Sequence, residues 1–169
     1  MCFDIVMGLE EIPRGAKVTY REAVRGVVLK DRDLILMVHT SKGDYKFPGG
    51  GVEDGEDHLC ALIREFREET GFEISETIKP VGIITEQKPD VFEKDAYFVM
   101  KSYYYACKIT GENGIQNLDQ YEKELDFKAV YVPIKEAYIR NKELLESGTT
   151  DINTWVERET LCLKKLIYL

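Results

Sequence analysis

The stretch from Gly50 to Phe72 constrains this chain most, because glycines, acids and apolar residues recur in it at intervals that suit one helix. In a helix beginning near Asp57, Glu65, Glu68 and Glu69 are spaced i, i+3 and i+4, so their carboxylates project from one face. Three ionised acids this close repel one another and raise each other's pKa unless a cation lies among them. Hard oxygen ligands of this kind suit Mg²⁺ or Mn²⁺ rather than zinc. The spacing therefore predicts a divalent-metal site on a helix.

The same helix has an apolar face beside the acidic one. The apolar residues recur at i, i+3, i+4 and i+7, namely at Leu59, Leu62, Ile63 and Phe66. We expect this face to pack on a sheet while the acidic face stays available for chemistry. Glu56 lies next to the expected helix start, where an acid favours the helix dipole, and Gly71 follows the last acids as a helix C-terminal glycine would.

A glycine-rich turn precedes the helix. Residues 47–51 read Phe-Pro-Gly-Gly-Gly and end a short expected strand. Glycines without side chains let a backbone carbonyl or amide approach a metal ion or a phosphate closely. Within the helix, the fork of donors on Arg64 is well shaped to fix the orientation of one glutamate. Turn and helix together indicate metal chemistry on a phosphate-containing substrate.

The whole pattern is more specific than any one of its acids. It reads, in order, Gly50, five residues, Glu56, seven residues, Arg64-Glu65, an apolar residue, any residue, Glu68-Glu69, any residue, Gly71 and an apolar residue. Every fixed position of the Nudix signature is present, so the chain resembles a Nudix hydrolase. The resemblance implies an α/β/α sandwich with a mixed sheet. It also implies hydrolysis of a nucleoside diphosphate linked to another group, with Mg²⁺ or Mn²⁺ assisting the attack of water on phosphorus.

The resemblance also assigns roles to individual residues. The expected metal ligands are the carboxylates of Glu65, Glu68 and Glu69 and the carbonyl of Gly49. Arg64 is expected to orient a ligand glutamate, and Glu56 to support the metal shell. The general base differs among family members; we favour Glu68. The implied catalytic set is therefore Glu56, Arg64, Glu65 and Glu68.

Residues outside the motif offer further candidates. The expected loop 117–126 carries Asp119, Glu122 and Glu124, and we favour Glu122 or Glu124 as an auxiliary ligand or base, with solvated loop acids as the alternative. Tyr45 precedes the glycine-rich turn, where it either stacks on a base or covers the sheet, and packing is the preferred interpretation. The cations expected nearest to substrate phosphates are Arg21, Arg25 and Lys46, each of which is also compatible with a surface role.

The length of 169 residues favours one domain, which we expect over residues 19–169, after an N-terminal extension over 1–18. Residues 19–29 and 34–39 read as the two strands of a hairpin. Further strands are expected at 78–87, 96–109 and 127–132. The sequence predicts the last two helices at 134–145 and 151–166. Strands around a central helix, with a terminal helix, indicate an α/β or α+β sandwich.

The net charge, the N-terminal residues and the cysteines limit the possible partners and the possible location of the protein. The net charge of −8 argues against binding of a nucleic-acid polymer, although a bound metal allows a small anionic substrate. Residues 1–17 lack the features of a signal peptide, and no run approaches the roughly 18 apolar residues of a membrane span. The four cysteines form no CxxC pair. These features predict a cytoplasmic protein with reduced thiols that acts on a small nucleotide, as a monomer or a homodimer.

Three functions remain open at this point. The first is hydrolysis of a nucleotide sugar such as ADP-ribose, or of an oxidised nucleoside triphosphate. The second is a Nudix-like sensor that binds nucleotide without cleaving it, although such domains commonly lose motif acids. The third is the isomerisation of isopentenyl diphosphate on a Nudix fold, which usually departs from the full acidic motif. The retained acids favour the hydrolase.

Overall fold

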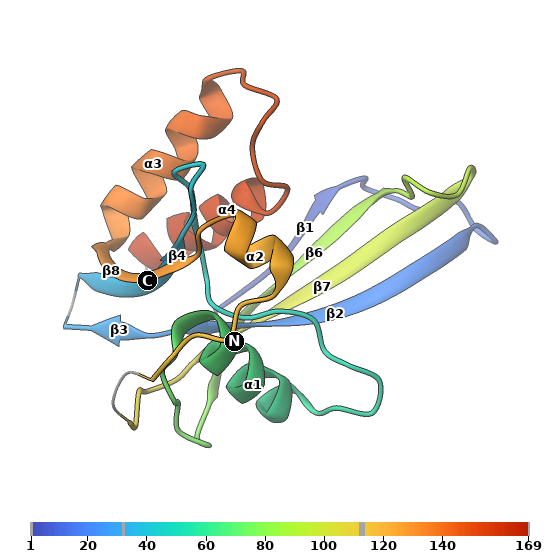
Figure 1. Ribbon diagram of the computed structural model, residues 1–169. Helices are drawn as coiled ribbons and strands as arrows, with labels where there is room; N and C mark the ends of the chain where they lie inside the picture. The colour runs from blue at the N-terminus through green and yellow to red at the C-terminus, as the bar shows by residue number, and fades with distance from the viewer. Residues whose placement is uncertain (1, 32, 112–113, 169) are drawn as a thin grey trace.

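The strands form two four-stranded sheets, one of which combines parallel and antiparallel pairs (Figure 1). The computed structural model describes residues 2–31, 33–111 and 114–168. In the first sheet the middle pair is antiparallel and both outer pairs are parallel. Its strand order is β1 (Phe3–Gly8), β6 (Lys79–Pro89), β7 (Ala96–Ala106) and β2 (Lys17–Val27). The mixed sheet is the kind that the sequence predicts.

The second sheet is antiparallel and is arranged around β4 (Leu34–His39). Strand β4 pairs along its whole length with β8 (Lys128–Pro133), and at its two ends with β3 (Leu29–Lys30) and β5 (Tyr45–Lys46). The predicted hairpin of 19–29 with 34–39 is wrong in its long arm, because β2 pairs with β7 and only the short β3 that follows it pairs with β4. Residues 23–28 are all buried, and a strand buried on both faces needs a place inside the sandwich rather than in a two-stranded ribbon.

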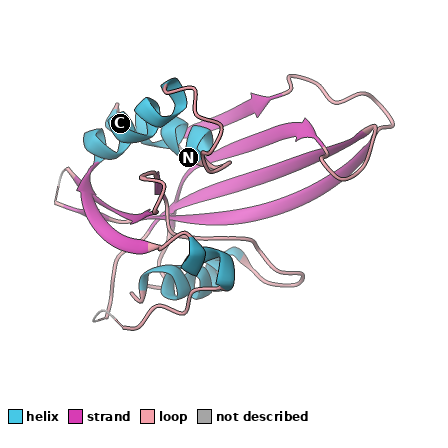
Figure 2. Cartoon of the chain, turned by 45° about the horizontal axis from the view of Figure 1, so that its top comes forward, coloured by secondary structure: helices cyan, strands magenta, loops and turns pink. Residues whose placement is uncertain are grey.

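Helices lie on both sides of the strands (Figure 2). On one side is α1 (His58–Thr70), and on the other are α3 (Ile134–Glu146) and α4 (Val156–Ile167). The core divides accordingly: Leu36 of β4 packs with α1, whereas Ile35 and Met37 pack with residues of α3 and α4. This alternation is that of a strand with two covered faces. The architecture is the α/β/α sandwich predicted from the sequence.

Helix α1 has the ends predicted for it. The Asp57 side chain accepts a hydrogen bond of 2.8 Å from the amide of Cys60, and Gly71 ends the helix in the left-handed region at φ 75°. Leu62 and Phe66 are fully buried, as expected for the apolar face, whereas Leu59 is only partly buried. Local sequence therefore specifies this helix almost completely.

The last helix begins later than predicted. Helix α4 starts at Val156 instead of residue 151. The side chains of Asn153 and Trp155 instead donate hydrogen bonds of 2.8 and 2.7 Å to the buried carboxylate of Asp44. These long-range bonds hold the preceding segment outside the helix. No helix among the described residues is both long and apolar enough to cross a membrane.

Residues of the expected N-terminal extension also take part in the first sheet. Strand β1 pairs in parallel with β6, and Phe3 is buried against the aromatic ring of Tyr104. The division of the chain at residue 18 stays a prediction. In the structure, however, the segment before it contributes both an edge strand and part of the core.

Candidate functional site

The glycine-rich turn runs along β2 and is held there by backbone hydrogen bonds. The amide of Val24 donates to the carbonyl of Gly50 at 2.9 Å. Gly49 has φ 136°, and a Cβ atom on it would lie 2.1 Å from the carbonyl oxygen of Val24. A Cβ atom on Gly50 would lie 2.0 Å from Oε2 of Glu65. Gly49 therefore lets the turn lie against the backbone of β2, and Gly50 leaves the space that the Glu65 carboxylate occupies.

Arg64 connects the acids of the motif with one another. Its Nε and Nη2 donate to the two oxygens of Glu56 at 3.0 and 2.7 Å, and its Nη1 donates to Glu65 at 2.6 Å. Nη2 also donates to the carbonyl of Gly51 at 3.1 Å. The hydrogen bonds from Arg64 lower the pKa of Glu56. The structure thus brings Glu56, Arg64 and Glu65 together through hydrogen bonds from one guanidinium group.

Glu68 lies one turn further along α1 and is more accessible. Its side chain is 37% exposed, against 16% for Glu65 and 2% for Glu69. Partial burial, followed by the negative charge of Glu65, raises the pKa of Glu68. Its Oε2 is 3.7 Å from Nη1 of Arg64. An accessible carboxylate with a raised pKa is suited to accepting a proton from water.

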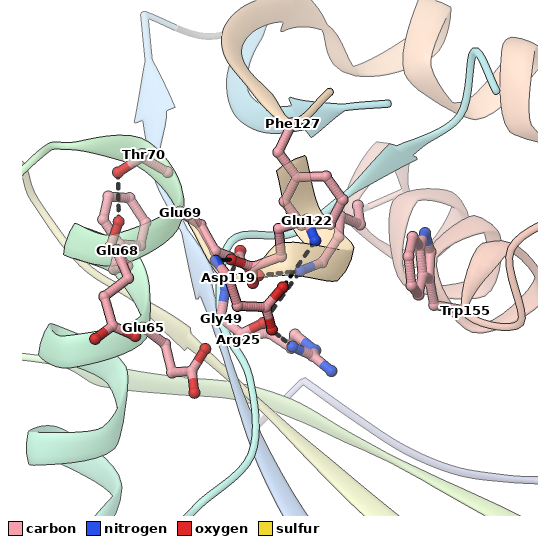
Figure 3. Close-up of polar contacts among 12 residues, drawn as sticks. Arg25, Gly49, Glu65, Glu68, Glu69, Thr70, Asp119, Glu122, Phe127 and Trp155 are labelled. Atoms are coloured by element: carbon pink, nitrogen blue, oxygen red, sulfur yellow. Dashed lines mark hydrogen bonds and ion pairs between the residues drawn. The ribbon is translucent and has the colours of Figure 1, made fainter. Parts of the chain in front are cut away.

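Glu69 is directed into the protein, toward the glycine-rich turn (Figure 3). Its Oε2 accepts a hydrogen bond of 2.9 Å from the amide of Gly49, and its Oε1 pairs with the ammonium group of Lys46. Nζ of Lys46 is also 3.3 Å from the carbonyl oxygen of Gly49, to which Nη1 of Arg25 donates as well. Lys46 and Arg25, the two candidate substrate-binding cations, therefore lie at the site. Both contact the carbonyl oxygen of Gly49, and Lys46 also contacts Glu69.

The acids after residue 117 were expected in a loop. They lie instead in and next to the short helix α2 (Gln120–Glu124). Asp119 and Glu122 form a capping box, in which each carboxylate accepts a hydrogen bond of 2.8 Å from the other residue's amide. Burial and the negative charge of Glu69 raise the pKa of Glu122 to about 7, although its hydrogen bond from Asp119 opposes the shift. Glu124 instead accepts from the exposed side chain of Gln120. Of the two acids favoured from the sequence, Glu122 therefore faces the site and Glu124 does not.

The acids and the turn surround two neighbouring cavities, of about 380 and 350 Å³. The smaller is lined by Glu65, Glu68, Asn117, Leu118, Asp119 and Glu122. The larger adds the cations and an aromatic wall, and its lining includes Arg21, Arg25, Lys46, Gly49, Glu69, Tyr121, Phe127 and Trp155. A hollow of about 590 Å³ beside Lys79 and Cys107 is bigger, but no carboxylate lines it. A cavity of about 550 Å³ on α1 is lined by Arg64 and Glu68, but by no other acid and by no residue of the glycine-rich turn. The acids therefore converge on the two smaller cavities.

Tyr45 does not line either cavity. Its ring packs on His39 at 4.8 Å between centroids, and its backbone exchanges hydrogen bonds of 2.8 Å with the buried side chain of Asn141. The structure thus favours the packing interpretation of Tyr45. The aromatic residues that do line the site, Tyr121, Phe127 and Trp155, are far from the motif in sequence. No local pattern distinguishes them, apart from Trp155 being the only tryptophan in the chain.

The donors present suit a hard divalent cation, but ion pairs within the protein keep them apart. Glu65, Glu68 and Glu122 line one cavity, and a carboxylate oxygen of Glu65 fills the space that a side chain on Gly50 would need. Among the described residues, no three His, Cys, Asp or Glu side chains are already gathered around one metal position. Arg64 engages Glu65, and Lys46 engages Glu69. The residues fit a metal ion in chemical type, and Glu69 becomes available to the metal only when its pair with Lys46 rearranges.

Comparison with known proteins agrees with the fold and the motif. The family model described as the NUDIX domain matches residues 19–156, which is most of the chain. This protein belongs to the Nudix family.

Individual relatives match over shorter stretches. The uncharacterized Nudix hydrolase YvcI of Bacillus subtilis is 40% identical over 103 residues, which cover 56% of this chain and 60% of that protein. An ADP-ribose pyrophosphatase of Methanocaldococcus jannaschii is 42% identical over 52 residues, covering 29% of this chain and 31% of that protein. The chain thus spans less than two thirds of the curated relatives it matches.

A solved structure extends the likeness in fold to nearly the whole chain. A NUDIX hydrolase from Nitrosomonas europaea aligns with a TM-score of 0.59 at 17% identity. The alignment covers 89% of this chain and 90% of that protein. At this identity the likeness concerns the fold alone.

Proposed function

We propose that this protein is a metal-dependent pyrophosphohydrolase that cleaves a nucleoside diphosphate linked to another group. The observation that carries the proposal is the convergence of Glu65, Glu68 and Glu122 on one cavity beside the glycine-rich turn. Membership of the Nudix family supports the same reaction class. A cavity with this density of carboxylates needs cations to accept a phosphate, and Mg²⁺ or Mn²⁺ supplies them.

The metal would be held by Glu65, Glu68, Glu69 and the carbonyl of Gly49, with Glu122 as an auxiliary ligand or base. When bound, it neutralises phosphate oxygens and lowers the pKa of water. Arg64 fixes Glu65 through a charge-assisted hydrogen bond. In this proposal Glu68 accepts the proton of the attacking water, in line with its exposure and its raised pKa.

The larger cavity supports a nucleotide as the substrate. Arg21 and Arg25 provide positive charge for phosphate groups along β2. Phe127 and Trp155 line the same cavity and provide an aromatic wall on which a base can stack. We infer a nucleotide sugar such as ADP-ribose, because the Methanocaldococcus jannaschii relative is an ADP-ribose pyrophosphatase, with an oxidised nucleoside triphosphate as the second choice. The net charge of −8 disfavours a polymer.

Purified protein tests this proposal when it is incubated with nucleotide sugars, dinucleotides, oxidised triphosphates and a 5′-triphosphorylated RNA. With Mg²⁺ or Mn²⁺, we expect release of a nucleoside monophosphate or of phosphate from at least one small nucleotide, and none after chelation. Glu68→Gln should lower kcat by about 10²–10⁴-fold, the range for loss of a positioned base. The matched variant Glu76→Gln, at an exposed position after α1, should keep full activity.

One feature of the site favours a second function. Lys46 and Arg64 already pair with Glu69 and Glu65, so these two carboxylates are neutralised without a metal. A sensor that binds nucleotide without cleaving it would use such a site as it stands. Tight, metal-independent nucleotide binding with no turnover across the panel would support the sensor and contradict the hydrolase.

A further inference from the structure

Lys46 occupies the space between two oxygen donors of the proposed metal site. It extends from β5 into the protein, and its side chain is only 6% exposed. Its ammonium group pairs with Oε1 of Glu69 and lies 3.3 Å from the carbonyl oxygen of Gly49. A positively charged group of this chain thus bridges the carboxylate and the carbonyl.

Aromatic rings complete the surroundings of this ammonium group. Nζ of Lys46 lies 4.8 Å from the ring centroid of Phe127 and 5.6 Å from that of Trp155. Both distances are within the range of attractive cation–π contacts. Oxygens on one side and ring faces on the other therefore stabilise the charged form of the side chain. The ammonium group of Lys46 therefore occupies a site that is suited to a cation, and Lys46 is not a surface lysine.

The ammonium group and a metal ion cannot both use these oxygens in the same arrangement. Glu69 is almost fully buried, so it requires a positive partner, and Lys46 now provides it. A divalent cation held by Glu69 and the Gly49 carbonyl would meet the positive charge of Lys46 at close range, and like charges repel strongly in a partly buried site. The metal must therefore replace the ammonium group.

We propose that Lys46 is a resident cation that neutralises Glu69 in the metal-free protein and must be displaced from Glu69 and the Gly49 carbonyl when a divalent metal binds. This inference rests on the proposed function, because it takes these two groups as metal ligands. The neighbouring cavity of about 380 Å³, which Lys46 lines, provides space for the displaced side chain. The side chain has four rotatable bonds and can turn into this cavity without movement of β5.

The displacement has a consequence for substrate binding. Arg21 and Arg25 line the same cavity as Lys46, so the displaced ammonium group joins two guanidinium groups there. Their combined charge favours an anion, and a phosphate of the substrate is the anion that the proposed reaction provides. Loading of the metal would in this way make a further cation available to the substrate.

Calorimetric titration of the full chain with Mn²⁺ and with Mg²⁺ tests the displacement without any measurement of activity. In Lys46→Met, which keeps much of the apolar stem, we expect the metal to bind about tenfold more tightly or better, because a competing charge is gone. Lys46→Arg keeps the charge and should show no such gain. Lys128→Met removes an exposed lysine of β8 and should match the wild type.

Each outcome of the titration is informative. Wild-type or weaker metal affinity in Lys46→Met would overturn the displacement while leaving the proposed hydrolase intact, since turnover is measured separately. No metal binding in either protein would overturn the metal site and the inference with it, even if nucleotides still bind.

A second measurement uses the wild type alone, so that it does not depend on the folding of a variant. Acetic anhydride labels accessible lysines, and mass spectrometry reports each position. Buried Lys46 should be labelled slowly in the metal-free protein and several-fold faster at saturating Mg²⁺, whereas exposed Lys128 should not change. Equal protection of Lys46 with and without bound metal would contradict the displacement.

Discussion

At the scale of single residues, the glycines of the turn determine how closely the turn approaches β2 on one side and Glu65 of α1 on the other. Gly49 lies against backbone and Gly50 against a flexible side chain, so the two positions differ in what a methyl group would disturb. The pattern of glycines is visible in the sequence. Which atoms they approach is not, because β2 and α1 reach the turn only through tertiary packing.

Substitution of these glycines should therefore separate stability from activity. Gly49→Ala places Cβ 2.1 Å from a backbone oxygen at a positive φ, and should lower the free energy of unfolding by about 1–3 kcal/mol or more. Gly50→Ala displaces the Glu65 carboxylate instead, and should reduce kcat with a smaller loss of stability. Urea denaturation and steady-state kinetics measure the two effects. Equal losses of stability would contradict this distinction.

Gly55→Ala is the matched control for the turn. Gly55 has φ 81°, but nothing lies within 4 Å of an added Cβ atom. It should therefore show only the modest cost of a left-handed conformation and full activity. An activity loss as large as that of Gly50→Ala would indicate that any change near the motif is harmful.

The pair between Glu56 and Arg64 predicts a dependence of stability on acid pH. Arg64 lowers the pKa of Glu56 in the folded state below the ordinary value of 4.5. The carboxylate thus contributes stability above pH 4.5, and this contribution is lost as the pH falls through the lowered folded pKa. Glu56→Gln should remove on the order of 1 kcal/mol near pH 7, and its deficit should shrink toward pH 3. Denaturation midpoints across this range provide the measurement, and a deficit independent of pH would contradict the ionic explanation.

At the scale of elements, α4 is anchored to the sheet by buried charges that the sequence pattern does not reveal. Arg158 lies between Glu86 of β6 and Glu159, at 2.6 Å from each carboxylate, and Glu159 is 3.9 Å from Arg25 of β2. Arg25 in turn donates to the carbonyl of Gly49. The last helix is thereby connected with the glycine-rich turn through β2.

Removal of one of these charges should be costly, because it leaves a buried carboxylate without a partner. Arg158→Met should destabilise the protein by about 3–5 kcal/mol. The exposed pair of Arg140 and Glu143 in α3, at 3.8 Å, serves as the control: Arg140→Met should cost less than about 1 kcal/mol. Chemical denaturation compares the two, and similar costs would show that the buried cluster has no special role.

Some of these elements could be predicted from the sequence and others could not. Helix α1 was predictable because its cap, its apolar face and its terminal glycine are all local. The end of β2, the start of α4 and the difference between Glu122 and Glu124 were not. Each depends on a partner distant in sequence, namely β7, Asp44 and the cavity beneath α2. Periodicity identifies faces of elements, but it does not identify the elements that cover them.

At the scale of the whole molecule, the site lies where the sandwich brings its two sheets and α1 together. Strand β2 of the first sheet hydrogen-bonds to the glycine-rich turn, β5 of the second sheet contributes Lys46, and α1 contributes the acids. The motif predicted the acids and the reaction class. The aromatic wall and the ion pairs that neutralise the acids could not be predicted from the motif, because they depend on tertiary packing. They underlie the proposals for how a base stacks and for how a metal replaces Lys46.

The central claim is that these acids promote attack of water on phosphorus with the help of a divalent metal. Hydrolysis of ADP-ribose, or of whichever small nucleotide the panel identifies, in ¹⁸O-labelled water tests it most directly by mass spectrometry of the products. We expect one ¹⁸O atom in a phosphate-bearing product, formed only when Mg²⁺ or Mn²⁺ is present and lost in Glu68→Gln. Unlabelled phosphate groups, or equal turnover in the presence of a chelator, would contradict it.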